Sequence, residues 1–265
     1  MDRNRIGENN MKNFSEEKLC LITGGSKGIG FSIAIEMAKK GYTIILNSRN
    51  PHNATQYLKE NNFKVIELPG DIKEDSFIKN LTEIIDNYGY VDSILLNYGG
   101  PPIKPFINIS EQEWIEYFNT IFLAPLRIIK EMIKYLEKSK YPRILAITSF
   151  TTIKPMKNMC ISNSLRMGLV NALKTIALET AEKNILINTL APGYIYTERL
   201  QEFIKKQSEI IGINHEEFKN SIEKTIPLNR IAQASELAKF ASFLLSEDNT
   251  YITGQHFTCD GGLTT

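Results

Sequence analysis

The most constraining stretch of this sequence is residues 18–30, where a short apolar run leads into three closely spaced glycines and then into a helical pattern. Leu19, Leu21 and Ile22 give the run enough apolar bulk for a strand buried on both faces, as a parallel sheet requires. Beyond the glycines, apolar residues recur at helical spacing up to Gly41, a residue that commonly ends a helix. The segment is therefore predicted to form a strand, a tight turn and the start of a helix.

A helix that begins beside a glycine turn directs unpaired backbone N–H groups and the positive end of its dipole at whatever lies there, and phosphate is the expected occupant. Gly24, Gly28 and Gly30 follow the spacing G-x-x-x-G-x-G, not the G-x-G-x-x-G of many dinucleotide folds. A glycine-rich turn without any ligand is the alternative interpretation. The strand before the turn and the helix after it favour a phosphate site.

Composition narrows the class of protein. The chain has 265 residues, of which 42% are hydrophobic, so it can bury one large core without a second domain. A net charge of +1 provides no basic field for nucleic acid, and no apolar stretch is long enough to cross a bilayer. We expect a cytoplasmic protein that binds neither nucleic acid nor membrane. The histidines form no cluster and the three cysteines have no metal-type spacing, which predicts reduced thiols and no metal site.

From Lys18 onward, short apolar runs alternate with longer helical patterns. Strands are predicted near residues 18–23, 43–48, 64–68, 91–97, 143–148, 185–191 and 255–259. This alternation is typical of right-handed βαβ crossovers. The predicted fold is α/β: a single Rossmann-type doubly wound domain over residues 15–265, with a parallel seven-stranded sheet and helices on both faces. The Asn-rich, charged residues 1–14 are predicted to be a flexible tail.

Several motifs occur together in a fixed order. Thr23 to Gly30 forms the glycine turn, Asn97-Tyr98-Gly99 follows the fourth strand, Ser149 follows the fifth, and Pro192-Gly193 follows the sixth. In this order they resemble the short-chain dehydrogenase/reductase family over about residues 15–262. The resemblance implies hydride transfer between a nicotinamide cofactor and a small-molecule carbonyl or alcohol substrate.

The end of the second strand bears on the choice of cofactor. In a dinucleotide fold an acidic side chain here binds the ribose hydroxyls of NAD, whereas a nearby arginine accommodates the extra phosphate of NADP. Ser48 stands where NAD-preferring relatives usually have aspartate, Arg49 follows it, and Lys27 could reach the same phosphate. The other interpretation of these cations is ordinary surface charge. Their joint placement favours NADP over NAD.

The resemblance also carries over residue by residue. Asp71 and Ile72 are expected to contact the adenine, although Asp71 could equally cap the following helix. Asn97 is expected to stabilise the sheet and Gly99 to let the ribose approach. The predicted cofactor-binding residues are Gly24, Ser26, Lys27, Gly28, Ile29, Gly30, Arg49, Asp71, Ile72, Asn97, Gly99, Arg166, Pro192, Gly193, Ile195 and Thr197.

The catalytic positions depart from the family pattern. Ser149 matches the serine that hydrogen-bonds the substrate oxygen, but the usual Tyr-x-x-x-Lys is replaced by Ser162 and Arg166. A spacing of four residues places this pair on one helical face, where it could stabilise an oxyanion. It cannot easily move a proton, because serine is a weak acid and arginine stays protonated. A surface pair without a chemical role is the alternative.

Three further observations concern the active site. Tyr98, Tyr194 and Tyr196 are candidate proton donors, and each could equally be a wall residue. The position at which the family usually has a relay asparagine is Ile121, and Asn119 lies two residues away, on another side of a helix. The Gly-Gly-Pro-Pro and Ser-Asn-x-x-Arg segments resemble a subgroup often called 3-oxoacyl carrier-protein reductase-like.

Two helical regions suggest further properties. Ser110-Glu111-Gln112-Glu113 is a capping box that predicts a long helix to about Leu136. In similar proteins this helix and the one after Ser162 pair across a two-fold axis, which implies a homodimer or homotetramer. The charged, amphipathic insert at about residues 198–225, broken near Gly212, is placed to act as a lid over substrate.

Two functions from different classes remain open at this stage. The leading hypothesis is an NADP-dependent oxidoreductase with an altered proton-donor arrangement, in which Ser149, Ser162 and Arg166 are the catalytic residues. The alternative is a catalytically impaired protein that senses NADP(H) or serves as a partner subunit. The apparently intact cofactor site favours the first, and the missing tyrosine and lysine favour the second.

Overall fold

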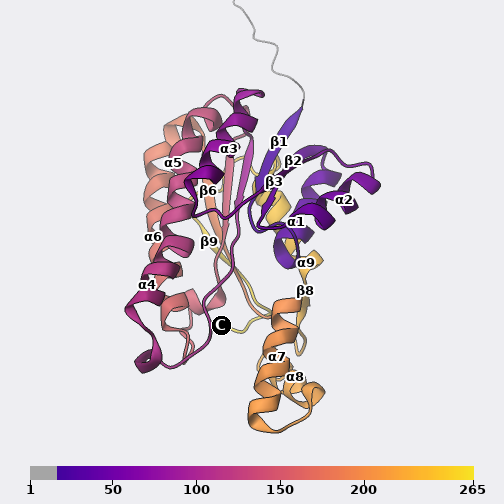
Figure 1. The fold of residues 1–265 in the computed structure, drawn as a ribbon, viewed down its shortest axis with the longest axis vertical. Coiled ribbons are helices and arrows are strands. Elements are labelled where there is room, and N and C mark those ends of the chain that lie inside the picture. Colours follow the sequence, from indigo (N-terminus) through magenta and orange to yellow (C-terminus); the bar gives the residue numbers. More distant parts are fainter. Residues whose placement is uncertain (1–16) are drawn as a thin grey trace, which may run out of the picture.

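The computed structural model describes residues 17–265, so the tail predicted at residues 1–14 lies outside the described residues. A parallel sheet of seven strands runs through the domain in the order β3-β2-β1-β4-β5-β6-β9 (Figure 1). Its strands are β1 (Lys18–Ile22), β2 (Tyr42–Ser48), β3 (Val65–Pro69), β4 (Ser93–Leu96), β5 (Arg143–Ile147), β6 (Leu186–Pro192) and β9 (His256–Cys259). The predicted seven-stranded α/β domain is confirmed.

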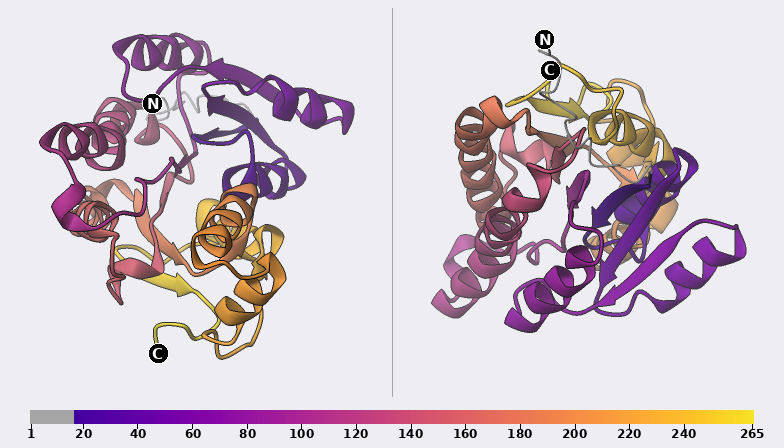
Figure 2. Two further views of the ribbon diagram at one scale, coloured as in Figure 1. Left: turned by 60° about the horizontal axis from the view of Figure 1, so that its bottom comes forward. Right: turned by 90° about the horizontal axis from the view of Figure 1, so that it is seen from above.

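Helices cover both faces of the sheet (Figures 1 and 2). One face carries α3 (Asp75–Asp86), α4 (Glu111–Phe118), α5 (Ala124–Leu136) and α6 (Cys160–Thr180). The other carries α1 (Gly28–Lys39), α2 (His52–Glu60) and α9 (Ala234–Leu245). Single 3-10 turns occur at η1 (Phe106–Asn108), η3 (Phe150–Thr152) and η4 (Ala181–Lys183). No helix within residues 17–265 is long and apolar enough to span a membrane.

Side chains along the strand β1 point alternately to the two faces of the sheet, and each face has its own hydrophobic core. In β1, Leu19 and Leu21 point into the core beneath α3, α5 and α6, whereas Cys20 and Ile22 point into the core beneath α1, α2 and α9. Successive strand side chains face opposite sides of a sheet, and here both sides are covered. This is why the first strand is apolar at every residue from Leu19 to Ile22 rather than at every second residue.

The helix predicted from residue 110 to residue 136 is interrupted. The capping box at its start is present, with the Ser110 N–H donating to Glu113 Oε2 at 2.9 Å. A π-helical turn, η2 (Asn119–Leu123), separates α4 from α5, and the Ala124 N–H donates to the Asn119 carbonyl. Pro125 is the physical reason, because its ring has no N–H and would clash with a carbonyl four residues earlier in a regular helix.

The segment after β6 forms a small helical unit beyond the carboxyl ends of the strands (Figure 1). Its helices are α7 (Glu198–Ile211) and α8 (His215–Glu223), with Gly212 between them in the left-handed conformation at φ 77°. Two short strands, β7 (Ile195–Tyr196) and β8 (Ala232–Gln233), pair at its base. The unit has an apolar cluster of its own, formed by Leu200, Ile204, Ile222, Ile226 and Ile231.

Candidate cofactor site and active site

The carboxyl ends of β1 and β4 form the centre of the site. In the strand order, β2 and β3 lie on one side of β1, while β4 and the later strands lie on the other. The connections that leave β1 and β4 therefore run to opposite faces of the sheet, which makes this edge a topological switch point. Ligands of open α/β sheets bind at such a switch point.

Hydrogen bonds fasten the glycine turn after β1 to the end of β4. Thr23 Oγ1 accepts the Asn97 N–H at 2.9 Å, and Asn97 Nδ2 donates to the Gly24 carbonyl at 2.9 Å. A Cβ atom at Gly24 would lie 2.5 Å from the Asn97 carbonyl oxygen, and one at Gly30 would lie 2.3 Å from the Gly24 carbonyl oxygen. Both glycines are required because backbone segments touch here, and a side chain would force them apart.

The N-terminus of α1 is open to an anion. Its N-cap residue, Lys27, has extended backbone and makes no capping bond with its side chain, and no acidic residue lies in the first turn. The first N–H groups and the positive dipole end are therefore uncompensated. Gly28 has φ +58°, and Thr197 Cγ2 lies 3.3 Å from the place of its missing Cβ. The uncapped N–H donors, the half-buried Ser26 and Ile29, and the lack of an acidic residue in the first turn fit a phosphate group.

The end of β2 offers a hydroxyl and a cation. Ser48 Oγ is buried and has no hydrogen-bond partner within residues 17–265. Arg49 is exposed, and no carboxylate of the described chain lies within ion-pair distance of it. By contrast, the Lys27 ammonium lies 2.7 Å from Glu198 Oε2 on α7, a contact that raises the pKa of Lys27. Ser48 and Arg49 are thus available to a phosphate, whereas the Lys27 ammonium is already paired with Glu198.

The turn after β3 contradicts one of the two interpretations of Asp71, namely that its side chain caps the following helix. Asp71 Oδ1 accepts the Lys73 N–H at 3.0 Å, and α3 begins only at Asp75, with Glu74 as its N-cap residue. Asp71 therefore closes a local turn and does not cap the helix, because the N-cap position is three residues further on, at Glu74. Ile72 is buried beside it.

Ser149 lies two residues after Ile147, the last residue of β5, and both of its lone pairs are engaged. Its Oγ accepts the Thr151 N–H at 3.2 Å and the Thr151 hydroxyl at 3.1 Å. Because a serine hydroxyl has two lone pairs and one proton, the Ser149 O–H remains available as a donor. The side chain is half-buried at the carboxyl edge of the sheet.

Ser162 and Arg166 form a buried pair, so the interpretation of these residues as a surface pair was wrong. They are 3% and 7% exposed, and Arg166 Nε donates to Ser162 Oγ at 3.3 Å. Arg166 Nη1 donates to the carbonyls of Ile147 at 3.1 Å and Thr148 at 3.0 Å, at the end of β5. The inward face of α6 thus brings the guanidinium to the residue that precedes Ser149. The four-residue spacing indicated a shared helical face but not which way that face points.

Tyr98 lies against the same guanidinium. The centroid of its ring is 5.2 Å from Arg166 Cζ, a cation–π arrangement. Its hydroxyl is buried without a hydrogen-bond partner in the described chain. Burial raises the pKa of Tyr98 to about 12, although the Arg166 charge acts in the opposite direction. A phenol so reluctant to ionise and so enclosed is suited to packing under Arg166 rather than to giving up a proton.

The turn after β6 lies at the same edge of the sheet as the glycine turn. Gly193 donates its N–H to the Cys259 carbonyl at 3.0 Å, and a Cβ there would lie 2.7 Å from Asp260 Cα. The buried Pro192 and Ile195 flank this turn. Thr197 Oγ1 accepts the Leu200 N–H at 3.4 Å and so caps α7. Of the predicted residues of this turn, Thr197 packs against Gly28 of the glycine turn.

Comparison with known proteins identifies the family. A family model described as enoyl-(acyl carrier protein) reductase matches residues 24–264. The chain is 30% identical to a 3-oxoacyl-[acyl-carrier-protein] reductase FabG of Buchnera aphidicola, over 94% of this chain and 98% of that protein. The chain belongs to the short-chain dehydrogenase/reductase family.

Two further relatives of this short-chain dehydrogenase/reductase carry a more specific description. The NADPH-dependent reductase BacG of Bacillus subtilis is 29% identical over 93% of this chain and 97% of that protein. The crystal structure of L-sorbose reductase from Gluconobacter frateurii, complexed with NADPH and L-sorbose, superposes with a TM-score of 0.88. It is 28% identical and covers 93% of this chain and 96% of that chain.

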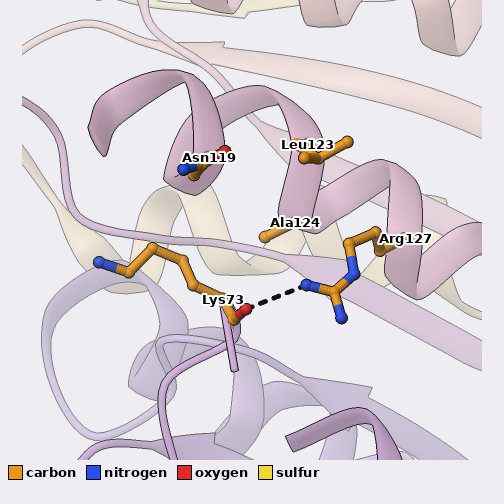
Figure 3. Close-up of a pocket in the computed structure, with 5 residues that line it drawn as sticks. All are labelled: Lys73, Asn119, Leu123, Ala124 and Arg127. Atoms are coloured by element: carbon orange, nitrogen blue, oxygen red, sulfur yellow. Dashed lines mark hydrogen bonds between the residues drawn. The ribbon is translucent and has the colours of Figure 1, made fainter. Parts of the chain in front are cut away.

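In this short-chain dehydrogenase/reductase, Asn119 lies in the π-turn between α4 and α5. Asn119 lines a cavity of about 170 Å³ with Lys73 and Arg127, and Arg127 Nη1 donates to the Lys73 carbonyl at 3.0 Å (Figure 3). Ile121, at the usual asparagine position, is fully buried. The other two tyrosines also differ in setting, because Tyr194 packs on Phe150 and Tyr196 is partly exposed.

Sequence reasoning missed one residue that reaches the site. Arg199, at the start of α7, donates from Nη2 to the Pro101 carbonyl at 3.4 Å, in the loop after β4. Its guanidinium also adjoins Gly100. Nothing in the sequence pairs residues about a hundred positions apart, and Arg199 looked like one more charge on an amphipathic helix. The Gly99-Gly100 pair, which has no side chains, was the only local sign in the sequence that another segment packs closely against this loop.

Proposed function

We propose that this protein is an NADP-dependent oxidoreductase that transfers hydride between nicotinamide and the carbon of a carbonyl or alcohol group. The observation that carries the proposal is the placement of two features at one edge of the sheet. They are the uncapped N-terminus of α1 and the group formed by Ser149, Ser162 and Arg166. The relatives named NADPH-dependent reductase and sorbose reductase support the cofactor and the reaction type.

The residues present fit NADP. The N–H groups at the start of α1 would hold the pyrophosphate, and Ser48 with Arg49 would hold the additional phosphate. Asp71 and Ile72 would contact the adenine, and Gly99 leaves open space, with no atom within 4 Å of an added Cβ, for the ribose. The turn from Pro192 to Thr197 would border the nicotinamide. When bound, the reduced cofactor supplies the hydride and the oxidised cofactor accepts it.

Ser149 would orient the substrate. Both Ser149 lone pairs accept hydrogen bonds from Thr151, so its proton points away from them and is free for the substrate oxygen. Removal of one such donor typically lowers turnover by about 10²–10³-fold. We therefore expect Ser149→Ala to lower kcat by about that factor with little change in KM.

Arg166 would stabilise the negative charge that develops on that oxygen, with Ser162 held against its Nε. Arginine does not release a proton near neutral pH, so the alkoxide formed in reduction takes its proton from water. The absence of a positioned acid typically costs about 10²–10⁴-fold in rate. A slow but measurable reductase is therefore expected.

The helical unit of α7 and α8 would act as a lid over the substrate. It has its own apolar cluster, and the ion pair from Glu198 to Lys27 joins it to the glycine turn. Both partners of that ion pair are mostly exposed, so it contributes little to stability and can open. A unit that has its own apolar cluster and is joined to the glycine turn by a weak ion pair can move as one body.

We also propose a cytoplasmic homodimer or homotetramer built on the helices α4, α5 and α6. In α4, the π-turn η2 and α6, five large apolar side chains are at least 39% exposed: Ile115, Phe118, Leu123, Met167 and Leu178. Light scattering would give the assembly state. A monomer at micromolar concentration would contradict the proposal.

Two measurements test the proposed activity. Fluorescence titration with NADPH reports whether the cofactor binds, and NADPH oxidation is followed with 3-oxoacyl thioesters, quinones and diketones. Binding together with turnover that falls in Ser149→Ala and Arg166→Ala is the expected result. Absence of NADPH binding at millimolar concentration would refute the proposal.

One observation favours a second function, a catalytically silent NADP(H) sensor or partner subunit. Three hydrogen bonds of Arg166 go to Ser162 and to the carbonyls of Ile147 and Thr148, so the guanidinium also holds α6 to β5. A residue used in this way could be retained for structure alone. NADPH binding without turnover of any substrate, and without change in Arg166→Ala, would favour the sensor.

A further inference from the structure

Two guanidinium groups converge on a single glycine beside the proposed active site. A Cβ atom added to Gly100 would lie 2.7 Å from Arg199 Nη2 and 3.2 Å from Arg166 Nη2. Arg166 belongs to α6, Arg199 begins α7, and Gly100 is in the loop after β4. Because Gly100 has no side chain, the two cations can meet against its backbone.

Neither cation has a carboxylate partner within residues 17–265. Elsewhere in the described chain, Arg127 pairs with Asp75 and Arg230 pairs with Glu236. Arg199 makes one long hydrogen bond, to the Pro101 carbonyl at 3.4 Å. Arg166 donates from Nε and Nη1, and its Nη2 has no partner among the described residues. Guanidinium N–H groups of Arg166 and Arg199 near Gly100 therefore have no hydrogen-bond acceptor among the described residues.

The arrangement costs free energy unless an anion is present. Burial lowers the pKa of Arg166, and the Arg199 charge acts in the same direction. Burial of its guanidinium lowers the pKa of Arg199 as well, although Tyr117 and Glu202 act in the opposite direction and the residue as a whole stays exposed. Both groups nevertheless remain charged near neutral pH, since arginine does not deprotonate in proteins. A buried arginine with a second cation beside it favours a ligand of opposite sign.

Another arginine shows what a purely structural role looks like here. Arg143 is 2% exposed, and it donates to the carbonyls of Asn249 at 2.8 Å and Pro142 at 3.0 Å. Burial lowers its pKa, and nearby Tyr42, Tyr141 and Glu247 act in the opposite direction. Arg166 and Arg199 differ, because their guanidinium groups lie against the same glycine and the Arg199 charge lowers the pKa of Arg166 further.

We propose that Arg166 and Arg199 bind a carboxylate of the substrate, so that the substrates are small oxo acids and the corresponding hydroxy acids. This inference rests on the proposed function, since it names the substrate class of the same site. Nη2 of Arg166, whose Nε and Nη1 are already engaged, and the guanidinium of Arg199 would each donate to the carboxylate. Arg166 also binds the carbonyl of Thr148, next to Ser149, so the carboxylate would lie only a few bonds from the reacting carbonyl.

The test compares acids with their uncharged esters. Pyruvate, acetoacetate and levulinate, each beside its methyl ester, are offered as substrates for NADPH oxidation and as ligands in calorimetry with NADP present. Charge-assisted hydrogen bonds contribute about 1.5–3 kcal/mol, which corresponds to about 10–100-fold in affinity. Arg199→Met should weaken acid binding and raise the KM for acids by that factor, without changing either value for esters.

Two further variants complete the design. Gly100→Ala should displace the Arg199 guanidinium and produce the same selective loss for acids, while both arginines remain. Lys206→Met removes a positive charge from an exposed position of the same helix and should leave acids and esters unchanged. A loss that is equal in Lys206→Met would indicate general charge attraction and overturn the assignment.

The remaining outcomes distinguish this inference from the proposed function. Turnover of esters as readily as acids would overturn the carboxylate site and leave the oxidoreductase intact. A weaker NADPH affinity in Arg199→Met would also overturn it, by assigning the pair to the cofactor. Carboxylate binding without NADPH oxidation on any substrate would refute the oxidoreductase and leave only an anion site.

Discussion

Replacement of Gly30 by alanine tests the packing of the glycine turn. The added Cβ would lie 2.3 Å from the Gly24 carbonyl oxygen and 2.7 Å from Asn97 Nδ2. Carbon and oxygen atoms approach to about 3.3 Å, so the turn must open by roughly 1 Å. That movement also breaks or lengthens the 2.9 Å hydrogen bond from Asn97 to the Gly24 carbonyl.

The expected loss follows from these contacts. Overpacking costs about 1–3 kcal/mol and the lost hydrogen bond about 1 kcal/mol, while the better helix propensity of alanine offsets up to about 1 kcal/mol. The free energy of unfolding should fall by about 1–3 kcal/mol. For a domain of this size, that lowers Tm by about 3–10 °C. NADPH affinity should fall as well, because the N–H groups at the start of α1 move with the turn.

Gly99→Ala is the matched control, because no atom lies within 4 Å of its added Cβ. Thermal unfolding should give a Tm within about 2 °C of the unmodified protein. NADPH titration should nevertheless show weaker binding, since the methyl group occupies the space predicted for the ribose. Equal Tm values for Gly30→Ala and the unmodified protein would refute the contact argument. A Gly99→Ala variant as unstable as Gly30→Ala would refute the distinction between the two glycines.

Three further predictions concern single side chains. Arg49→Ala should weaken NADPH binding about 10-fold or more and NADH binding little, in parallel fluorescence titrations, and equal losses would contradict its role at the extra phosphate. Tyr98→Phe removes a buried hydroxyl that has no hydrogen-bond partner in the described chain, so urea unfolding should show an unchanged or slightly higher free energy of unfolding. Turnover should persist in this variant, and loss of turnover would make Tyr98 the proton donor. Burial lowers the pKa of His256, whose ring nitrogens contact the Thr152 and Thr189 hydroxyls. The neutral ring therefore contributes stability at neutral pH that is lost as pH falls below about 6.5, the value in the unfolded chain. His256→Gln should show a smaller fall in stability between pH 7.5 and pH 5.5, and an identical fall would count against the assignment.

Local patterns were sufficient for the framework of the fold. Apolar runs predicted all seven strands of the main sheet, and the capping box at Ser110 predicted the start of α4. These features depend on neighbours in sequence, such as strand alternation or a side chain three residues away. The π-turn before Pro125 was not predicted, because the capping box indicates where a helix begins and not whether its hydrogen-bond pattern continues.

The site depends on contacts between distant segments, and only part of it could be predicted. The glycine turn and Ser149 were identified because they lie at strand ends, and strand ends of a parallel sheet share one edge. The burial of Ser162 and Arg166 was not predicted, since spacing defines a helical face but not its direction. The approach of Arg199 to Gly100 depends on where α7 packs, and no local pattern records that.

The sequence by itself determined the order of strands and helices, the glycine turn and the replacement of tyrosine and lysine by Ser162 and Arg166. Only the tertiary structure decided that Arg166 points inward, that Lys27 pairs with Glu198, and that a second arginine joins the first. The physical reason is the range of the forces involved. Backbone conformation and hydrophobic periodicity act between near neighbours, whereas charge pairing depends on packing between segments that the chain keeps far apart.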